Sequence, residues 1–114
     1  MTKIFAHRGA SAYAPENTME AFELAAKQGA DGIELDVHVT KDGEVVVTHD
    51  EKIDRVSNGS GFIKDMTLRE LKRLSFHNHM ESYVGAGIPT LREVLEFVKT
   101  TTMAVNIELK TGLY

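Results

Sequence analysis

The sequence of 114 residues predicts an α/β fold with a largely parallel sheet. Short apolar segments with the two-residue period of strands alternate along the chain with segments that have the period of helices. Residues that favour helix N-caps precede the helical segments, and glycine-containing turns separate several of the strand segments from their neighbours. Strands that alternate with helices pair in parallel, because each helix carries the chain back across the sheet.

The first strand is expected over Lys3 to His7, and it runs directly into Arg8-Gly9, which reads as a turn. A helix follows. Asn17 is expected to be its N-cap, and Glu20, three residues later, completes the pattern of a capping box. Gly29 is expected to end this helix.

The segment Gly32 to Val39 alternates strictly between apolar and polar residues, which is the periodicity of a strand. Its polar face carries Glu34, Asp36 and His38. A turn at residues 41–43 leads into a second β segment that begins with Val45 to Val47 and ends at His49-Asp50. These two segments are expected to pair as a hairpin.

Residues 51–87 are less regular, but Thr67 is expected to cap a short helix within them. A further helix is expected after Thr90, with Glu93 completing a capping box. The buried stripe of that helix is expected to comprise Leu91, Val94, Leu95 and Val98. The last strand is expected over Met103 to Leu109.

The composition, 42% hydrophobic and 26% charged, is that of a globular protein. The formal net charge of -4 and the scattered lysines and arginines argue against a nucleic-acid partner. The absence of cysteine excludes disulfides and thiolate–zinc sites. Without a secretory signal or an apolar window of membrane-spanning length, we expect a cytoplasmic protein that has no stable membrane insertion.

Glu34 and Asp36 lie two residues apart and therefore project from the same face of their strand. Both faces of a parallel sheet are normally covered, and a buried carboxylate is costly unless it is paired or bound to a cation. Salt bridges to basic residues are the commoner outcome for such a pair, and metal binding is the alternative. Glu108 repeats the pattern in the last strand, and three carboxylates suit Mg²⁺ or Ca²⁺.

His7 and His49 each lie at the carboxyl end of a β segment, where α/β proteins place their active sites. Two imidazoles can supply a base and an acid near neutral pH, although packing is the commoner role of any single histidine. Arg8 presents a planar fork that matches phosphate oxygens, and Lys110 adds a second positive charge. The alternative for Arg8 is a buried ion pair with a carboxylate. For His38, on the carboxylate face, a structural role is expected.

Five motifs span almost the whole chain: AHRG at 6–9, PENT at 15–18, GIELDVHVTKDGEVVVTHD at 32–50, IPTL at 88–91 and NIELK at 106–110. Each motif is weak alone. In this order and spacing, the set is highly specific, and it resembles the glycerophosphodiester phosphodiesterase family.

The resemblance implies the N-terminal part of a TIM (β/α)₈ barrel, in a metal-dependent hydrolase that cleaves glycerophosphodiesters to sn-glycerol 3-phosphate and an alcohol. It implies His7 and His49 as the catalytic pair, and Arg8 and Lys110 as contacts to the phosphate of this small-molecule substrate. The implied ligands of one divalent cation, Mg²⁺ or Ca²⁺, are Glu34, Asp36 and Glu108. Residues 51–87 match the family's small insertion after the second barrel strand.

A complete barrel of this kind needs about 250 residues, so residues 1–114 are expected to form a partial barrel domain. Its last strand would leave a bare edge, through which the chain is expected to form homo-oligomers unless the missing half covers it. Two functions of different class follow: hydrolysis, or a non-catalytic fragment that binds metal or phosphate and self-associates. A related barrel phospholipase ranks lower, because apolar membrane-facing loops are not evident.

Overall fold

The computed structural model describes residues 3–109, which contain a four-stranded sheet built around one central strand. Its strands are β1 (Phe5–His7), β2 (Gly32–Val39), β3 (Val45–Val47) and β4 (Ala104–Leu109). The central strand β2 pairs in parallel with β1 and with β4, and it forms an antiparallel hairpin with β3. The predicted α/β class, the largely parallel sheet and the hairpin are therefore confirmed.

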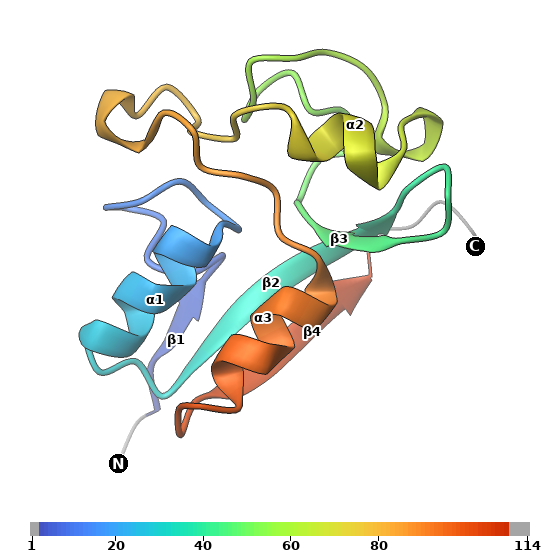
Figure 1. Ribbon diagram of the computed structural model, residues 1–114. Helices are drawn as coiled ribbons and strands as arrows, with labels where there is room; N and C mark the ends of the chain where they lie inside the picture. Colours follow the sequence, from blue (N-terminus) through green and yellow to red (C-terminus); the bar gives the residue numbers. More distant parts are fainter. Residues whose placement is uncertain (1–2, 110–114) are drawn as a thin grey trace.

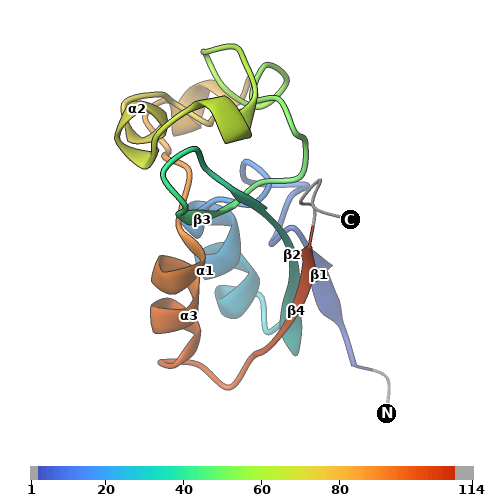
Figure 2. The same cartoon turned by 90° about the vertical axis from the view of Figure 1, so that its right-hand side faces the viewer.

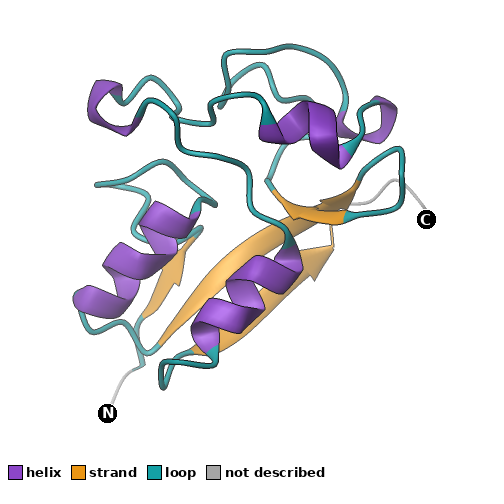
Figure 3. Ribbon diagram, in the orientation of Figure 1, coloured by secondary structure: helices purple, strands orange, loops and turns teal. Residues whose placement is uncertain are grey.

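Three α-helices lie within the described residues: α1 (Met19–Lys27), α2 (Leu68–Lys72) and α3 (Leu91–Val98). Two short 3₁₀ turns, η1 (Ile63–Asp65) and η2 (Glu81–Tyr83), complete the set shown in Figure 3. The predicted capping boxes of α2 and α3 are both present, because Thr67 and Thr90 each exchange hydrogen bonds with the glutamate three residues later. None of these helices is long and apolar enough to cross a membrane.

The main apolar core lies between the sheet and two helices. Figures 1 and 2 show α1 and α3 on the same side of the sheet. The side chains of β2 that face them are fully buried, as are the helix residues Phe22 and Val94. These β2 residues are Ile33, Leu35 and Val37. Removal of this apolar surface from water holds the helices against the sheet, and it leaves the polar side chains of β2 on the opposite face.

Residues 51–87 form a second layer beyond the carboxyl ends of the parallel strands (Figures 1 and 2). This segment has a small apolar core of its own, which packs against Val46 of β3. Its buried members in the segment are Ile53, Val56, Ile63, Leu71 and Phe76. The irregular backbone is therefore held in one conformation by hydrophobic burial, and it lies beyond the end of the sheet that carries the candidate catalytic residues.

Three local predictions are wrong: the N-cap at Asn17, its capping box with Glu20, and the burial of Leu95. Thr18, rather than Asn17, caps α1, with its side chain accepting a hydrogen bond from the backbone of Ala21. Asn17 has a φ of +56°, whereas an N-cap residue needs extended backbone, which Thr18 adopts with a φ of -112°. Leu95, predicted to be buried, is 37% exposed. The predicted stop of the helix at Gly29 is confirmed, because this glycine follows the C-cap with a φ of +80°.

Gly9 is needed for two physical reasons. Its φ is +79°, which residues with a side chain rarely adopt, and a Cβ there would lie 2.8 Å from the backbone carbonyl carbon of Ala21 in α1. Close approach of this turn to α1 therefore requires a glycine at this position. Gly43 has nearly the same φ, +82°, but a Cβ there would have no heavy atom within 4 Å.

We therefore expect Gly9→Ala to destabilise the protein more than Gly43→Ala. Gly43→Ala is the control, and its free energy of unfolding should fall by about 1–2 kcal/mol, the usual cost of left-handed backbone for a residue with a side chain. Gly9→Ala should lose a further 1–3 kcal/mol or so, because it also overpacks the turn against α1. Urea unfolding of both variants measures the difference. Equal losses would show that the contact with Ala21 relaxes freely.

Candidate active site

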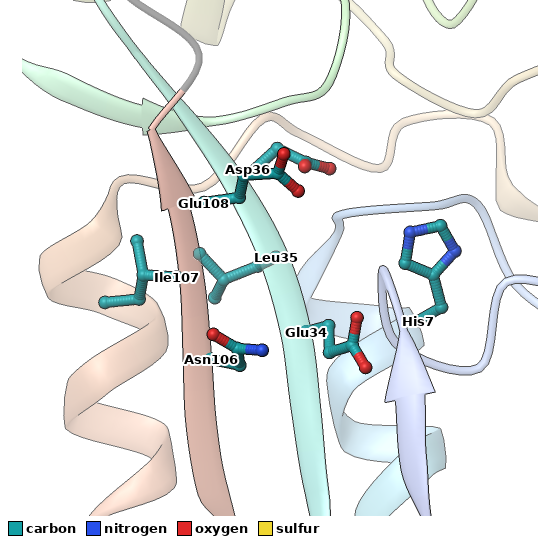
Figure 4. A pocket seen from close by; sticks show the side chains of 7 residues that line it. All are labelled: His7, Glu34, Leu35, Asp36, Asn106, Ile107 and Glu108. Carbon is teal, nitrogen blue, oxygen red and sulfur yellow. The ribbon is translucent and has the colours of Figure 1, made fainter.

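A pocket of about 210 Å³ opens beside the central strand. It is lined by His7 of β1, by residues Glu34 to Asp36 of β2 and by residues Asn106 to Glu108 of β4, as Figure 4 shows. Four of the seven residues predicted from the sequence as site residues thus meet in one place: His7, Glu34, Asp36 and Glu108. Lys110 lies outside the described residues.

The register of the strands explains this grouping. His7 pairs with Glu34 across β1 and β2, and Glu34 pairs with Asn106 across β2 and β4. Asp36 pairs with Glu108 in the next row. Paired residues of parallel strands point to the same face and lie about 4.8 Å apart. The polar period of two along each strand therefore becomes two polar rows across the sheet.

Three carboxylates line the pocket, together with the imidazole of His7 and the amide of Asn106, and carboxylate oxygens suit a hard divalent cation. The degree of burial differs: Asp36 is only 3% exposed, whereas Glu34 is partly exposed and Glu108 is exposed. Among residues 3–109, no three acidic or histidine side chains are close enough together to form a ready-made metal cluster. The three carboxylates thus share a pocket without converging on one point.

Asp36 is held by two side chains from the segment that follows β1. The amide of Asn17 donates a hydrogen bond to Oδ2 of Asp36 at 3.2 Å, and Nε of Arg8 lies 3.6 Å from the same oxygen. Arg8 also donates from Nη1 to Glu16 at 3.2 Å. The ion pair considered as the alternative role of Arg8 is therefore present in the structure.

Two buried atoms beside Asp36 form no hydrogen bond with the described residues: Nε of Arg8 and Oδ1 of Asn17. Nε of Arg8 still has its ion pair with Asp36, but Oδ1 of Asn17 has no hydrogen-bond partner among the described residues. Buried polar atoms normally form hydrogen bonds, so such an acceptor is typical of a site that completes its contacts with a ligand. An acceptor oxygen next to a carboxylate fits a cation or the water around one. Asn17 does not line the pocket, but it donates a hydrogen bond to Asp36, which does, so its acceptor supports a hydrated divalent cation beside Asp36.

His49 lies outside the lining of this pocket, in the segment after β3. A backbone hydrogen bond of 2.9 Å from Thr48 to the carbonyl of Asp36 ties that segment to β2. The carbonyl of His49 is 2.9 Å from Nε2 of His38. His38 is thus part of the scaffold that holds the backbone of His49, which agrees with the structural role expected for it.

The ring of His49 is held by its neighbour Asp50, with 2.9 Å between Nδ1 and Oδ1. A hydrogen bond from Arg55 is the main cause that lowers the pKa of Asp50 to about 2; burial opposes it, and the bond to His49 adds to it. The carboxylate of Asp50 is therefore ionised at neutral pH and can only accept hydrogen bonds. His49 must donate from Nδ1, which leaves the lone pair of the neutral ring on Nε2.

Arg55 was missed in the sequence, although it contacts both Asp50 and Glu16. Burial raises the pKa of Glu16, but the hydrogen bond and charge of Arg55, together with the charge of Arg8, lower it overall. Asp50 follows His49 directly and could have been singled out by that adjacency. Arg55 gave no comparable signal, because its contact with Glu16 spans 39 residues.

The chain matches the family model described as the glycerophosphoryl diester phosphodiesterase family over residues 7–114. It is 52% identical over 113 residues to a glycerophosphodiester phosphodiesterase of Caldanaerobacter subterraneus, covering 98% of this chain and 46% of that protein. It is 53% identical over 116 residues to one from Bacillus altitudinis, covering 100% of this chain and 47% of the relative. The chain thus spans just under half the length of these curated relatives.

Solved structures give the same result. A glycerophosphodiester phosphodiesterase of Agrobacterium tumefaciens superposes with a TM-score of 0.91 at 44% identity, covering 96% of this chain and 47% of that one. An Oleispira antarctica phosphodiesterase, in complex with the product sn-glycerol-3-phosphate, superposes with a TM-score of 0.93 at 38% identity, covering 97% and 45%. These neighbours are TIM-barrel enzymes, and the described residues form a partial α/β barrel with an open sheet. The chain belongs to the glycerophosphoryl diester phosphodiesterase family.

Proposed function

We propose that this chain carries the acid–base and phosphate-binding residues for hydrolysis of glycerophosphodiesters to sn-glycerol 3-phosphate and an alcohol. The observation that carries the proposal is the shared pocket of His7 and three carboxylates, in a chain of this family. The product complex of the Oleispira antarctica relative supports sn-glycerol 3-phosphate as the product.

Glu34, Asp36 and Glu108 would hold one divalent cation, Mg²⁺ or Ca²⁺. When bound, such a cation supplies positive charge that stabilises the negative charge growing on the phosphoryl oxygens. The chemistry of the donor set and the unpaired acceptor of Asn17 support this proposal.

The residues of the chain supply the proton transfers and the phosphate contacts. Arg8 and Lys110 would bind the phosphate oxygens and stabilise their charge in the transition state. One of the two histidines, His7 or His49, removes a proton from the nucleophile, which is water or the glycerol 2-hydroxyl. The nucleophile forms a bond to phosphorus as the bond to the departing alcohol breaks. With water as the nucleophile this gives sn-glycerol 3-phosphate directly, whereas attack by the 2-hydroxyl gives a cyclic phosphate that water must then open to the same product. The second histidine donates a proton to the departing oxygen, so an alcohol leaves rather than an alkoxide.

The alternative proposal is a non-catalytic chain that binds metal or phosphate and self-associates through the edge of its sheet. An assay of glycerol 3-phosphate release from glycerophosphocholine, with and without Mg²⁺ or Ca²⁺, separates the two proposals. Metal binding by a folded chain that releases no product would favour the alternative. A cytoplasmic location stays a prediction from the sequence.

We expect His7→Asn and His49→Asn each to lower turnover by about 10²–10⁴-fold, since positioned proton transfer contributes that much. Metal affinity, measured by calorimetry, should stay nearly unchanged, because neither histidine is a proposed ligand.

The matched control is His79→Asn. His79 is exposed, and asparagine tolerates its left-handed backbone, with a φ of +64°. This control should keep the turnover of the parent. A double variant of His7 and His49 that is as active as the parent would end the assignment of proton transfer to these residues.

We expect Glu34→Ala and Glu108→Ala each to weaken binding of Mg²⁺ or Ca²⁺ by about 10-fold or more, because each removes a charged oxygen donor. Titration calorimetry of the folded variants measures the change in Kd. Glu23→Ala is the control, since Glu23 is an exposed carboxylate on α1, away from the pocket. If Glu34→Ala and Glu108→Ala bind the cation as the control does, these residues are not ligands.

A further inference from the structure

Arg55 bridges two carboxylates that come from distant parts of the chain. Its guanidinium donates from Nη1 and Nη2 to the two oxygens of Glu16, at 2.8 and 3.0 Å. It also donates from Nε and Nη2 to the two oxygens of Asp50, at 2.8 and 3.3 Å. Every nitrogen of the guanidinium is therefore engaged, and both carboxylates are bound in a bidentate manner.

Each of these carboxylates contacts a residue proposed to act on the substrate. Asp50 accepts the hydrogen bond from Nδ1 of His49, at 2.9 Å. Glu16 accepts from Arg8, at 3.2 Å. The guanidinium of Arg55 is thus linked through one carboxylate to the proposed acid–base residue His49, and through another to the proposed phosphate-binding residue Arg8.

The charges of this cluster require a cation in the position of Arg55. The side chain of Glu16 is only 10% exposed, and that of Asp50 is 30% exposed. Two carboxylates that are largely withdrawn from water repel each other and are costly without a positive partner. Arg8 contacts Glu16 and Asp36, whereas His49 is the other partner of Asp50. Among residues 3–109, Arg55 is the one side chain with ion pairs to both Glu16 and Asp50.

Arginine suits this position for geometric reasons. Its planar fork presents donors in fixed directions, so it can bind two carboxylates at once and fix their orientation. A lysine would supply the same charge from a single point and could not reproduce the paired contacts. The geometry therefore points to a role for Arg55 in orientation in addition to charge balance.

We propose that Arg55 is a positioning residue that fixes Asp50 against His49 and Glu16 against Arg8, and so orients both residues for the reaction. This inference rests on the proposed function, since it takes the roles of His49 and Arg8 from it. Arg55 does not line the pocket, and within residues 3–109 its hydrogen bonds go to Glu16 and Asp50, so it would act through these two carboxylates.

The titration of Asp50 supports the proposal and gives it a pH dependence. The groups that face Asp50 are Arg55 and His49, with the like charge of Glu16 nearby. The pKa of Asp50 is lowered from 3.8 to about 2 in the folded protein. Its contribution to stability is therefore fully present above about pH 4 and is lost as the pH falls through 2. Loss of Arg55 should raise this pKa, so the stability difference between parent and variant should shrink below pH 4.

The test compares Arg55→Gln, which removes the charge, with Arg55→Lys, which keeps it without the fork. Nuclear magnetic resonance of the labelled chain follows the carboxyl carbon of Asp50 and the ring nitrogens of His49. In the parent we expect the proton of the neutral His49 ring on Nδ1. Arg55→Gln should raise the midpoint of Asp50 from about 2 towards 3.8 and mix the two ring tautomers. Arg55→Lys should give an Asp50 midpoint and a tautomer ratio between those of the parent and those of Arg55→Gln.

The matched controls are Arg69→Gln and Arg69→Lys, since Arg69 is an exposed arginine of α2, in the same segment of the chain. Both controls should behave as the parent does in every measurement. A second test uses Asp50→Asn as the background. If Arg55 acts on His49 through Asp50, adding Arg55→Gln to Asp50→Asn should cause no further change in the tautomer ratio of the His49 ring.

Turnover is a separate measurement. Arg55→Lys and Arg55→Gln should lower kcat by about 10-fold or more with a smaller change in KM, because misorientation affects the reaction more than binding. An unchanged tautomer and an unchanged Asp50 midpoint in folded Arg55→Gln would overturn the inference. If Arg55→Gln does not fold, Arg55→Lys decides in the same way. The resonance measurements need no substrate, so a chain without turnover would count against the proposed function and leave the contacts of Arg55 testable.

Discussion

The geometry of the site depends on one buried carboxylate, that of Asp36 on the central strand. At 3% exposure, its charge would be costly without partners, and Asn17 and Arg8 supply them. Both residues have left-handed backbone, with φ of +56° and +58°. Such a conformation costs roughly 1–3 kcal/mol in a residue other than glycine and persists only where its surroundings impose it. The need to place two side chains on Asp36 therefore explains the strained turn after β1, and why Asn17 cannot cap α1.

Local signals in the sequence predicted most of the fold. The alternation of Gly32 to Val39 marks β2, and Thr67 and Thr90 mark the starts of α2 and α3, because strand periodicity and capping boxes depend on neighbouring residues. The prediction that Asn17 is an N-cap was wrong because asparagine favours both N-caps and left-handed backbone. In the fold, Asn17 has left-handed backbone and donates a hydrogen bond to Asp36, 19 residues away. For the site, the polar period of two predicted Glu34, Asp36 and Glu108, and a position at the end of a strand predicted His7. All four residues line one pocket. Arg55 lay beyond such reasoning, since its contacts exist only in the folded chain.

Residues 51–87 show how an irregular segment can contribute a precise contact. Its backbone has few regular hydrogen-bonded elements, but its apolar core around Ile53 and Phe76 packs against Val46 of β3. Ile53 is fully buried, and Arg55 lies two residues after it. The anchor in the core limits where the guanidinium can lie, which lowers the entropy lost when a long side chain is ordered. Hydrophobic burial in this segment and the ion pairs of Arg55 thus depend on each other, and together they join the segment to the turn after β1 through Glu16.

The two proposed acid–base residues are held very differently. The ring of His49 donates from Nδ1 to Asp50, and its backbone is tied to β2 through Thr48 and His38. His7 is exposed at the end of β1, and within residues 3–109 its ring has no hydrogen-bond partner. An ionised carboxylate cannot release a proton to His49, so exchange with a substrate must take place at Nε2. No hydrogen bond within residues 3–109 selects a tautomer of His7 or fixes the orientation of its ring. We infer that one proton path is fixed in direction before the substrate binds, whereas the geometry of the other is set by the substrate itself.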